Sequence, residues 1–250
     1  MLALLGALRE EITGLQRHMV LEEASMQEDC RVFRGRYKNK AIVLVQTGIG
    51  KERAETATKF ILEHYPVTTM ISLGFAGALT EGLKIGDIIL CSTIYCGNGQ
   101  INRGPWQESL RSDTSLVSLA SQGRGVTTAG LYRGSSVTVA EPASSSKAKQ
   151  DLSKAFPAEV VDMESYWIAR IASTRHIPFI AIRAISDTMQ DSLLAFDQIL
   201  DSSGKWCWNK AIPHFVAHPQ HLIKLFTIYK NAQQARRSLT TAIDRLLAKL

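Results

Sequence analysis

Residues 158–188 read AEVVDMESYWIARIASTRHIPFIAIRAISDT, and an apolar segment stands near each end of this run. Both segments have the composition of buried strands. Between them Met163, Trp167 and Ile171 recur every four residues, which places their side chains on one face of a helix. Two strands joined by a helical crossover lie parallel, so we expect both to end at one edge of a sheet, where α/β proteins bind ligands.

Acidic residues follow both of these predicted strands. Asp162 and Glu164 come after the first strand, and Asp187 comes after the second. Carboxylates cost free energy there unless they are solvated, paired or used in chemistry. Capping of the helix by Asp162 or Ser165, and a turn opened by Ser186, would explain one acid at each exit. This structural explanation accounts less well for the pair of Asp162 and Glu164, so a ligand site is the alternative.

Similar patterns predict strands and helices along the rest of the chain. Strands are expected at 2–8, 32–37, 41–45, 69–73, 88–94, 130–132 and 136–140, and helices at 9–19, 52–64, 144–156 and 221–250. The first strand ends just before Glu10 and Glu11, a third place where carboxylates follow a strand. These elements indicate an α/β fold, and no linker divides the chain, so 1–250 is expected to be one domain with 201–250 appended to its core.

Two glycine-rich segments follow predicted strands. Residues 47–51, TGIGK, lack the Ser or Thr that follows the lysine of a phosphate-binding P-loop, because Glu52 stands there. We therefore expect a tight turn from strand to helix, with its backbone close to a ligand or to another strand. Residues 74–78, GFAGA, are mostly small, and such residues either admit a ligand close to the backbone or simply make a turn.

The composition narrows the class of protein. Of 250 residues, 45% are hydrophobic and 21% are charged, and the formal net charge is +6, all ordinary values for a soluble globular protein. Basic residues form no cluster over the first 200 positions, so no nucleic-acid partner is expected. The apolar start lacks a basic leader, and no run approaches the ~20 residues of a membrane span. Four cysteines without a C-x-x-C pair indicate buried thiols in a reducing location, so we expect a cytoplasmic protein.

Three histidines in the C-terminal part have the spacing of a metal site on a helix. His214, His218 and His221 stand at intervals of three and four residues. Pro219 interrupts that face, and no nearby acid completes a set of ligands. We therefore expect satisfied or solvent-facing histidines, with neither a metal nor a cofactor.

The last predicted helix carries an apolar stripe formed by Leu222, Leu225, Phe226 and Tyr229. A stripe of this kind predicts packing against the domain or against a partner subunit. Trp206 and Trp208 precede the helix, and basic residues lie along it. Aromatic and basic residues together also suit transient contact with a membrane surface, which is the alternative for this segment.

Taken jointly, several motifs resemble the nucleoside phosphorylase and nucleosidase superfamily. They are residues 6–11 (GALREE), 47–51 (TGIGK), 74–77 (GFAG), 86–87 (GD) and 183–187 (RAISD), in the family's order. Residues 161–165, VDMES, resemble the Glu-Met-Glu motif of methylthioadenosine/S-adenosylhomocysteine nucleosidases. The resemblance covers about residues 1–200 and implies a three-layer α/β/α fold around a twisted mixed sheet. It also implies a homodimer or larger homo-oligomer.

The same resemblance implies the chemistry of an N-glycosidase, which needs a proton for the leaving base and a nucleophile for the sugar. Asp187 would be the general acid to N7 of adenine, kept protonated by desolvation or by sharing a proton. Glu11 would orient or deprotonate the attacking water. Glu164 would accept hydrogen bonds from the ribose hydroxyls, and Met163 would pack under the sugar. The base would contact Ser186, Val139 and Ala140, and the substrate pocket would include Phe75, Ala76, Gly77 and Asp162.

Two positions depart from the methylthioadenosine enzymes, which carry Glu at the position of Asp162 and Ser at the position of Phe75. Both changes suit a bulkier apolar 5′-group on the adenosine. Together with VDMES, the Trp- and Pro-bearing tail and residues 235–239 (ARRSL) resemble the hopanoid-associated branch of the family. That branch is thought to convert adenosylhopane, a lipid-linked nucleoside, to ribosylhopane.

Other functions stay open beside this one. A methylthioadenosine/S-adenosylhomocysteine nucleosidase and a purine nucleoside phosphorylase are alternatives of the same class, and a non-catalytic nucleoside-binding module is one of another class. Arg9, Arg103 and Arg133 are the candidates for a phosphate clamp, although loop arginines are mostly solvated. Glu11 beside a phosphate would be repulsive, so hydrolysis is favoured over phosphorolysis.

Overall fold

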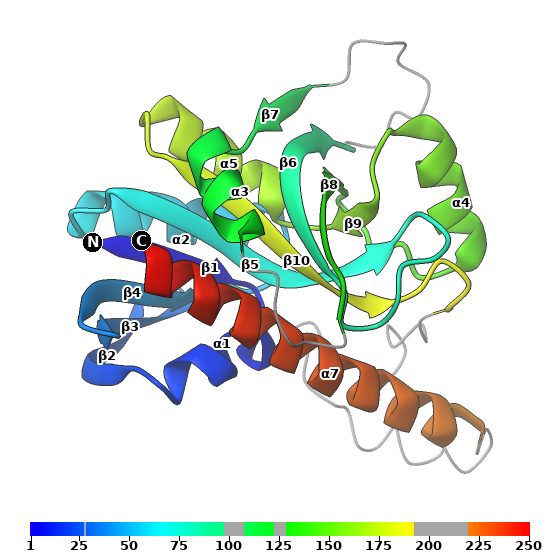
Figure 1. Ribbon diagram of the computed structural model, residues 1–250, viewed down its shortest axis with the longest axis horizontal. Helices are drawn as coiled ribbons and strands as arrows, with labels where there is room; N and C mark the ends of the chain where they lie inside the picture. Colours follow the sequence, from blue (N-terminus) through cyan, green and yellow to red (C-terminus); the bar gives the residue numbers. More distant parts are fainter. Residues whose placement is uncertain (28, 98–107, 123–128, 193–219) are drawn as a thin grey trace.

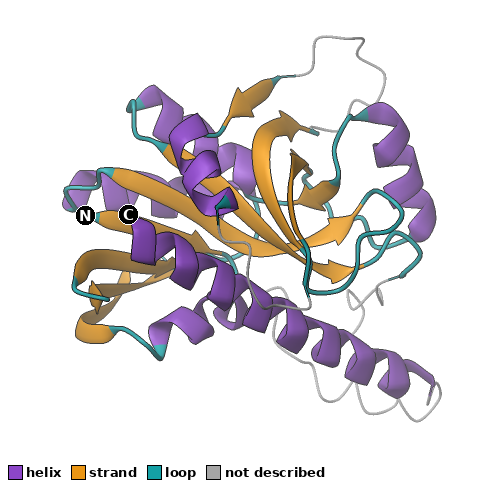
Figure 2. Cartoon of the chain, viewed as in Figure 1, coloured by secondary structure: helices purple, strands orange, loops and turns teal. Residues whose placement is uncertain are grey.

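The computed structural model describes residues 1–27, 29–97, 108–122, 129–192 and 220–250, with side chains in the last segment described from residue 225. A twisted mixed sheet forms the centre of the molecule, and helices cover both of its faces (Figures 1 and 2). The predicted α/β class, with helices on both sides of a mixed sheet, is confirmed.

Ten strands and six helices make up the described part of the chain. The strands are β1 (Leu2–Gly6), β2 (Val20–Gln27), β3 (Cys30–Tyr37), β4 (Lys40–Gln46), β5 (Thr69–Ala78), β6 (Ile88–Cys96), β7 (Ser109–Arg111), β8 (Leu131–Thr138), β9 (Val160–Asp162) and β10 (Phe179–Asp187). The helices are α1 (Arg9–Gln16), α2 (Lys51–His64), α3 (Thr114–Ser121), α4 (Ser146–Ala155), α5 (Ser165–Thr174) and α7 (Gln220–Lys249).

The strand order brings several strand ends to one place. The order is β10-β6-β8-β9-β5-β1-β4-β3-β2, and β10 also pairs with β5, so five of the strands close into a ring. Strands β4, β1, β5 and β10 pair in parallel. Their carboxyl ends therefore lie at one edge, which is where side chains from different parts of the chain meet.

The predicted direction of one strand is wrong. We expected β9 and β10, the two strands of the run at 158–188, to lie parallel. Instead β10 is parallel to β5, whereas β9 is antiparallel to it. The closed ring allows β9 to approach the end of β5 from the side opposite β10. The two carboxyl ends still meet, because Val161 and Asp187 are both in register with Gly77 of β5.

The glycine-rich segment at 74–78 belongs to a strand and not to a turn, because β5 continues to Ala78. A side chain at Gly74 would have its Cβ 3.0 Å from Glu11 Oε1 and 3.2 Å from Arg183 Nη1. At Gly77 it would lie 2.8 Å from Asp187 Oδ2. These small residues therefore make room for charged side chains that reach across β5 from neighbouring elements.

Two further expectations for strands need correction. The weak strands predicted at 130–132 and 136–140 form one strand, β8, because the polar residues between them keep an extended backbone that pairs with β6. Strand β2 was not predicted. It is exposed over nearly all of its length, so its sequence carries no alternation of buried and exposed residues. The predicted hairpin is confirmed as β3 and β4.

Apolar residues form a cluster on each face of the sheet. Ala54 and Ile61 of α2 and Trp167 of α5 pack on one face. Helices α1 and α7 pack on the other face, with Ile12 and Leu239 among the buried residues. Helix α7 has 30 residues, so it is ~45 Å long, and in Figure 1 it extends past the sheet at its N-terminal end.

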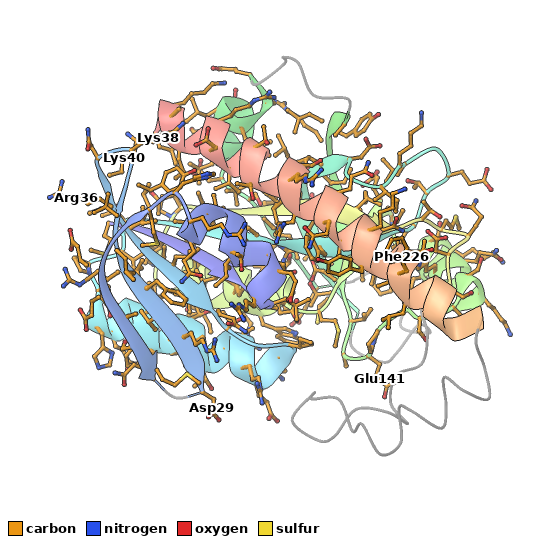
Figure 3. All side chains as sticks on the ribbon, turned by 90° about the horizontal axis from the view of Figure 1, so that it is seen from below. Asp29, Arg36, Lys38, Lys40, Glu141 and Phe226 are labelled. Carbon is orange, nitrogen blue, oxygen red and sulfur yellow. The ribbon has the colours of Figure 1, made fainter. Side chains whose placement is uncertain are left out.

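The apolar stripe of α7 is not packed as we expected. Phe226 and Tyr229 are 69% and 60% exposed, whereas Ala235, Leu239 and Ile243 are fully buried. Figure 3 shows Phe226 on the half of α7 that lies away from Lys38 and Lys40. The prediction that this stripe packs on the chain's own domain is therefore wrong for these two residues. The reason is that the N-terminal part of α7 extends beyond the edge of the sheet. Packing against a partner subunit stays a prediction.

Several expectations concern the tail or the absence of special features. Trp206, Trp208, Pro213, His214 and His218 lie outside the described residues, as does the side chain of His221. Over the described ranges, no cluster of His, Cys, Asp and Glu is arranged to hold a metal ion. No helix in that part of the chain is both long and apolar enough to cross a membrane. The predicted burial of thiols is confirmed for Cys30 and Cys91, whereas Cys96 is only half-buried and Cys207 lies outside the described residues.

Candidate functional site

A cavity of about 410 Å³ opens where β1, β5, β9 and β10 end. Its size is within the range of ~300–1,000 Å³ that is usual for small-molecule sites. It is lined by Ala7, Leu8, Glu11, Ile49, Phe75, Ala76, Gly77, Val139, Pro142, Ala143, Val161, Asp162, Met163, Glu164, Ser186 and Asp187. Ten of the eleven site residues predicted from the sequence are in this set. The other, Ala140, is exposed and does not line the cavity, where Pro142 and Ala143 lie instead.

Glu11 is held at the cavity by two backbone groups. It lies in the first turn of α1, where Leu8 N donates to its Oε2 at 2.8 Å. Phe75 N, from β5, donates to its Oε1, also at 2.8 Å. Burial raises the pKa of Glu11, although these hydrogen bonds and the positive charge of Arg183 act in the opposite direction. A carboxyl group fixed in this way can accept a proton from a water molecule.

Glu164 faces the cavity from the N-terminus of α5. Gly50 N donates to its Oε1 at 2.8 Å, so the glycine turn at 47–51 brings its backbone to a carboxyl group of another element. Burial raises the pKa of Glu164 to about 8, and the negative charges of Asp162 and Glu11 add to the effect. The side chain of Glu164 therefore takes up a proton more readily than a solvent-exposed glutamate does.

Asp162 is fully used by protein partners. Its Oδ1 accepts from Glu164 N at 3.1 Å, from Ser165 N at 3.0 Å and from Thr138 Oγ1 at 2.8 Å. Its Oδ2 accepts from Ser165 Oγ at 2.5 Å and from Arg183 Nε at 3.0 Å. Asp162 thus satisfies backbone N–H groups at the start of α5, in the manner of the structural explanation, although the N-cap residue of this helix is Glu164. A role in binding substrate stays a prediction, and the saturated oxygens argue against a direct one.

Arg183 is a buried cation close to Asp162, Glu11 and Glu164. Its Nη2 donates to Ser72 Oγ at 2.9 Å, and its Nε makes the ion pair with Asp162. Burial alone would lower the pKa of Arg183, but the negative charges of Asp162, Glu11 and Glu164 raise it. The guanidinium therefore stays charged and offsets part of the negative charge around the cavity. From the sequence, Arg183 was noted only as the first residue of the motif RAISD, with no role assigned to it.

Asp187 is paired with a lysine that sequence reasoning missed. Lys149 Nζ forms an ion pair with Asp187 Oδ2, and Ser186 Oγ donates to Asp187 Oδ1 at 2.7 Å. We expected desolvation or a shared proton at this acid, and the structure places a buried ammonium group beside it. A signal was present in the sequence, because Lys149 stands three residues before Leu152, so both fall on the buried face of α4.

Positive side chains are absent from the described lining of the cavity. Arg9 lines a different pocket, together with Arg31 and Gln46. Arg133 Nη2 donates to Ser121 Oγ at 2.7 Å, on another part of the molecule. Arg103 lies outside the described residues. Of the three candidates for a phosphate clamp, the two that the structure describes therefore do not line this cavity.

Comparisons with known proteins identify the family of the chain. A family model described as the phosphorylase superfamily matches residues 2–207. A 5′-methylthioadenosine/S-adenosylhomocysteine nucleosidase of Actinobacillus succinogenes is 29% identical over 220 residues, covering 82% of this chain and 93% of the relative. The nucleosidase of the same description from Staphylococcus haemolyticus is 28% identical over 223 residues, covering 82% and 94%.

Solved structures show the same fold at lower identity. A nucleosidase of this type from Neisseria meningitidis, in complex with methylthio-immucillin-A, has a TM-score of 0.78 at 22% identity and covers 100% of this chain and 99% of its own. The futalosine hydrolase of Helicobacter pylori has a TM-score of 0.78 at 19% identity, covering 100% and 97%. At these identities the likeness establishes the fold and leaves the substrate undetermined.

Proposed function

The chain belongs to the phosphorylase superfamily, and from this membership we propose that it is an N-glycosidase which releases adenine from a 5′-substituted adenosine. One observation carries the proposal. Glu11, Glu164 and Asp187 come from three distant parts of the sequence, and all three line a single cavity of about 410 Å³, a volume suited to a small molecule. An acid, a nucleophile activator and a ribose acceptor are the groups that this reaction needs.

In the proposed reaction, Asp187 transfers a proton to N7 of the adenine. The bond between the base and C1′ then breaks, and its electrons go to the base. Water attacks C1′ and gives a proton to Glu11, so the products are adenine and the free sugar derivative. Glu164 accepts hydrogen bonds from the ribose hydroxyls, Met163 packs under the sugar, and Ser186 and Val139 contact the base.

Water is proposed as the nucleophile in preference to phosphate. A phosphate would have to enter a cavity whose described lining has four carboxyl side chains and no Lys or Arg. The carboxyl groups that are ionised would repel phosphate, and no cation of the described lining offsets that repulsion, whereas neutral water meets no such cost. The nucleosidases to which the chain is similar support the same choice.

The substrate we propose first is a small thioether nucleoside, of the 5′-methylthioadenosine or S-adenosylhomocysteine type. The relatives from Actinobacillus and Staphylococcus are described as nucleosidases of these two compounds, and the match covers most of the length of each relative. From the same family membership we propose a homodimer or larger homo-oligomer.

A bulkier apolar 5′-group, of the adenosylhopane type, is the second candidate. Phe75 lines the cavity, and Ile49 lines it while remaining 53% exposed. A large exposed apolar side chain beside a substrate cavity favours contact with an apolar group. Such a lipid-linked substrate would also give a reason for transient contact of the C-terminal segment with a membrane surface.

A panel of adenosine derivatives tests these proposals. The panel contains adenosine, a methylthio derivative, a homocysteine derivative and a long-chain 5′-alkyl derivative, each incubated with and without phosphate. We expect free adenine and a sugar product without phosphate, formed at a rate independent of added phosphate. A sugar 1-phosphate would overturn hydrolysis. Binding without any release of adenine would favour the non-catalytic nucleoside-binding module.

A further inference from the structure

Lys149 is a buried cation that the proposed chemistry has not yet used. It lies in α4 with 0% exposure. Its ammonium group contacts Asp187 Oδ2 in an ion pair. The same nitrogen donates to Thr188 O at 2.6 Å and to Asp191 O at 3.0 Å. Three acceptors thus take the three hydrogens of the ammonium group.

Burial of a lysine is costly, so its surroundings indicate what it does. A buried ammonium costs several kcal/mol in desolvation unless a counter-charge and hydrogen bonds compensate it. Here the counter-charge is Asp187, which we propose as the general acid. Gly77 leaves the space for this contact, because a Cβ there would lie 2.8 Å from Asp187 Oδ2 and 3.4 Å from Lys149 Cε.

We propose that Lys149 is a positioning residue for Asp187, and this inference rests on the proposed N-glycosidase function. The ammonium group fixes Oδ2, so that the carboxyl group presents Oδ1, beside Ser186 Oγ, to the base. The reactive form is protonated Asp187, to which Lys149 donates a hydrogen bond. When this proton passes to the base, the carboxyl group becomes a carboxylate and its contact with Lys149 becomes the ion pair. A fixed ammonium group stabilises this negative charge more strongly in the transition state than before it.

The charges around Asp187 single out Lys149 for this role. The other acidic residues of the cavity are Glu11 on α1, Glu164 at the start of α5 and Asp162 at the end of β9, and all of them would disfavour a further negative charge. Arg183, which lies on β10 with Asp187, is already paired with Asp162. Lys149 is the basic side chain that contacts Asp187 in the part of the chain that the structure describes.

The contact also fixes the chain that follows β10. Asp191 Oδ2 accepts from Thr188 N and from Thr188 Oγ1, both at 2.8 Å, and so closes a turn. Lys149 donates to the carbonyl groups of Thr188 and Asp191 in this turn. Helix α4, the turn and the acid are therefore held by one ammonium group, which limits the rotation of the Asp187 carboxyl group.

The inference is tested with two variants and a matched control. Lys149→Gln keeps an N–H donor for the turn and removes the charge, Lys149→Arg restores the charge, and Lys147→Gln changes an exposed lysine of the same helix. We expect Lys149→Gln to lower kcat about 100-fold or more, as for loss of one charge-stabilising donor, with KM changed only a few-fold. The alkaline limb of its pH–rate profile should move to higher pH, because the acid loses its cationic neighbour. Lys149→Arg should return that limb towards the wild-type position.

A second measurement does not depend on turnover. In protein labelled with ¹³C at aspartate carboxyl groups, the Asp187 signal, assigned with Asp187→Asn, should titrate at higher pH in Lys149→Gln than in wild type. An unchanged titration, or an unchanged kcat and pH–rate profile in folded Lys149→Gln, would overturn the role of Lys149. If the titration moves but wild-type protein releases no adenine from any substrate, the coupling of the two residues holds and the proposed N-glycosidase function fails.

Discussion

At the scale of single residues, the acids of the cavity differ in their partners, and the partners decide what each acid can do. Asp162 has both oxygens occupied by protein donors. Glu11 and Glu164 face the cavity, and their hydrogen-bond partners among the described residues are backbone N–H groups. Asp187 combines an ammonium partner with a neighbouring hydroxyl group. Asp162 therefore serves structure, whereas the other three remain available for chemistry.

Asp187→Asn should leave the protein folded and remove most of its activity. The amide keeps the shape of the side chain but cannot donate the proton that the leaving base needs. A positioned acid is typically worth a hundred- to ten-thousand-fold in rate, so we expect adenine release to fall by about that factor. The rate is measured by chromatography of free adenine, and the melting temperature checks the fold. Turnover at the wild-type rate would remove Asp187 from the acid role.

Glu164 should make stability depend on pH. Its pKa rises from 4.5 to about 8 in the folded protein because of burial. Between these values the folded state keeps a proton that the unfolded state has lost, so the stability that this group contributes is present below pH 4.5 and is lost as pH rises through about 8.

Melting temperatures from pH 5 to 9 test this expectation. Glu164→Gln should show a shallower fall with rising pH than wild type, since glutamine does not titrate. Glu63→Gln, an exposed change on α2, serves as the control and should follow the wild-type curve. Parallel curves for wild type and Glu164→Gln would show that Glu164 titrates alike in the folded and unfolded states.

At the scale of elements, the junction of β9 and α5 depends on one carboxylate. Asp162 caps α5 through the backbone of Glu164 and Ser165, and it also neutralises Arg183 on β10. A helix start and a neighbouring strand are thus joined by a buried ion pair. The cap orients the first turn of α5, and this turn carries Glu164 to the cavity.

Asp162→Ala should destabilise the protein strongly. The change leaves Arg183 as a buried charge without its counter-charge, and removal of one partner of a buried pair typically costs about 3–5 kcal/mol. Urea unfolding followed by tryptophan fluorescence measures the loss. Glu55→Ala, which breaks the more exposed ion pair with Arg170, is the control and should have a much smaller effect. Equal losses for the two variants would contradict the structural role of Asp162.

At the scale of the whole molecule, the closed ring of five strands brings the acids together. Helix α7 packs on the face of the sheet opposite to α2 and α5. The ring lets β9 and β10 end beside Gly77 although they run in opposite directions. Helix α7 is half inside the domain and half outside it, since its buried residues begin near Ala235. The C-terminal half of this helix therefore belongs to the apolar core.

The two halves of α7 should respond differently to truncation of a side chain. Ile243 is fully buried against the sheet, so Ile243→Ala should lower the free energy of unfolding by about 2–5 kcal/mol. Phe226 is 69% exposed, so Phe226→Ala should change it by less than about 0.5 kcal/mol. Denaturant unfolding of both variants at one protein concentration is the measurement. A large loss in Phe226→Ala would point to a partner subunit that covers this half of the helix.

Most of the elements could be predicted from the sequence, because burial leaves a local periodic signal in strands such as β1 and helices such as α5. The motifs also identified the acids that line the cavity. The direction of β9, the ion pair of Lys149 with Asp187 and the exposure of Phe226 could not be predicted in this way. Each depends on which distant segments become neighbours. A periodic pattern records whether a side chain is buried, whereas its partner is selected only when the closed sheet brings separate parts of the chain into contact.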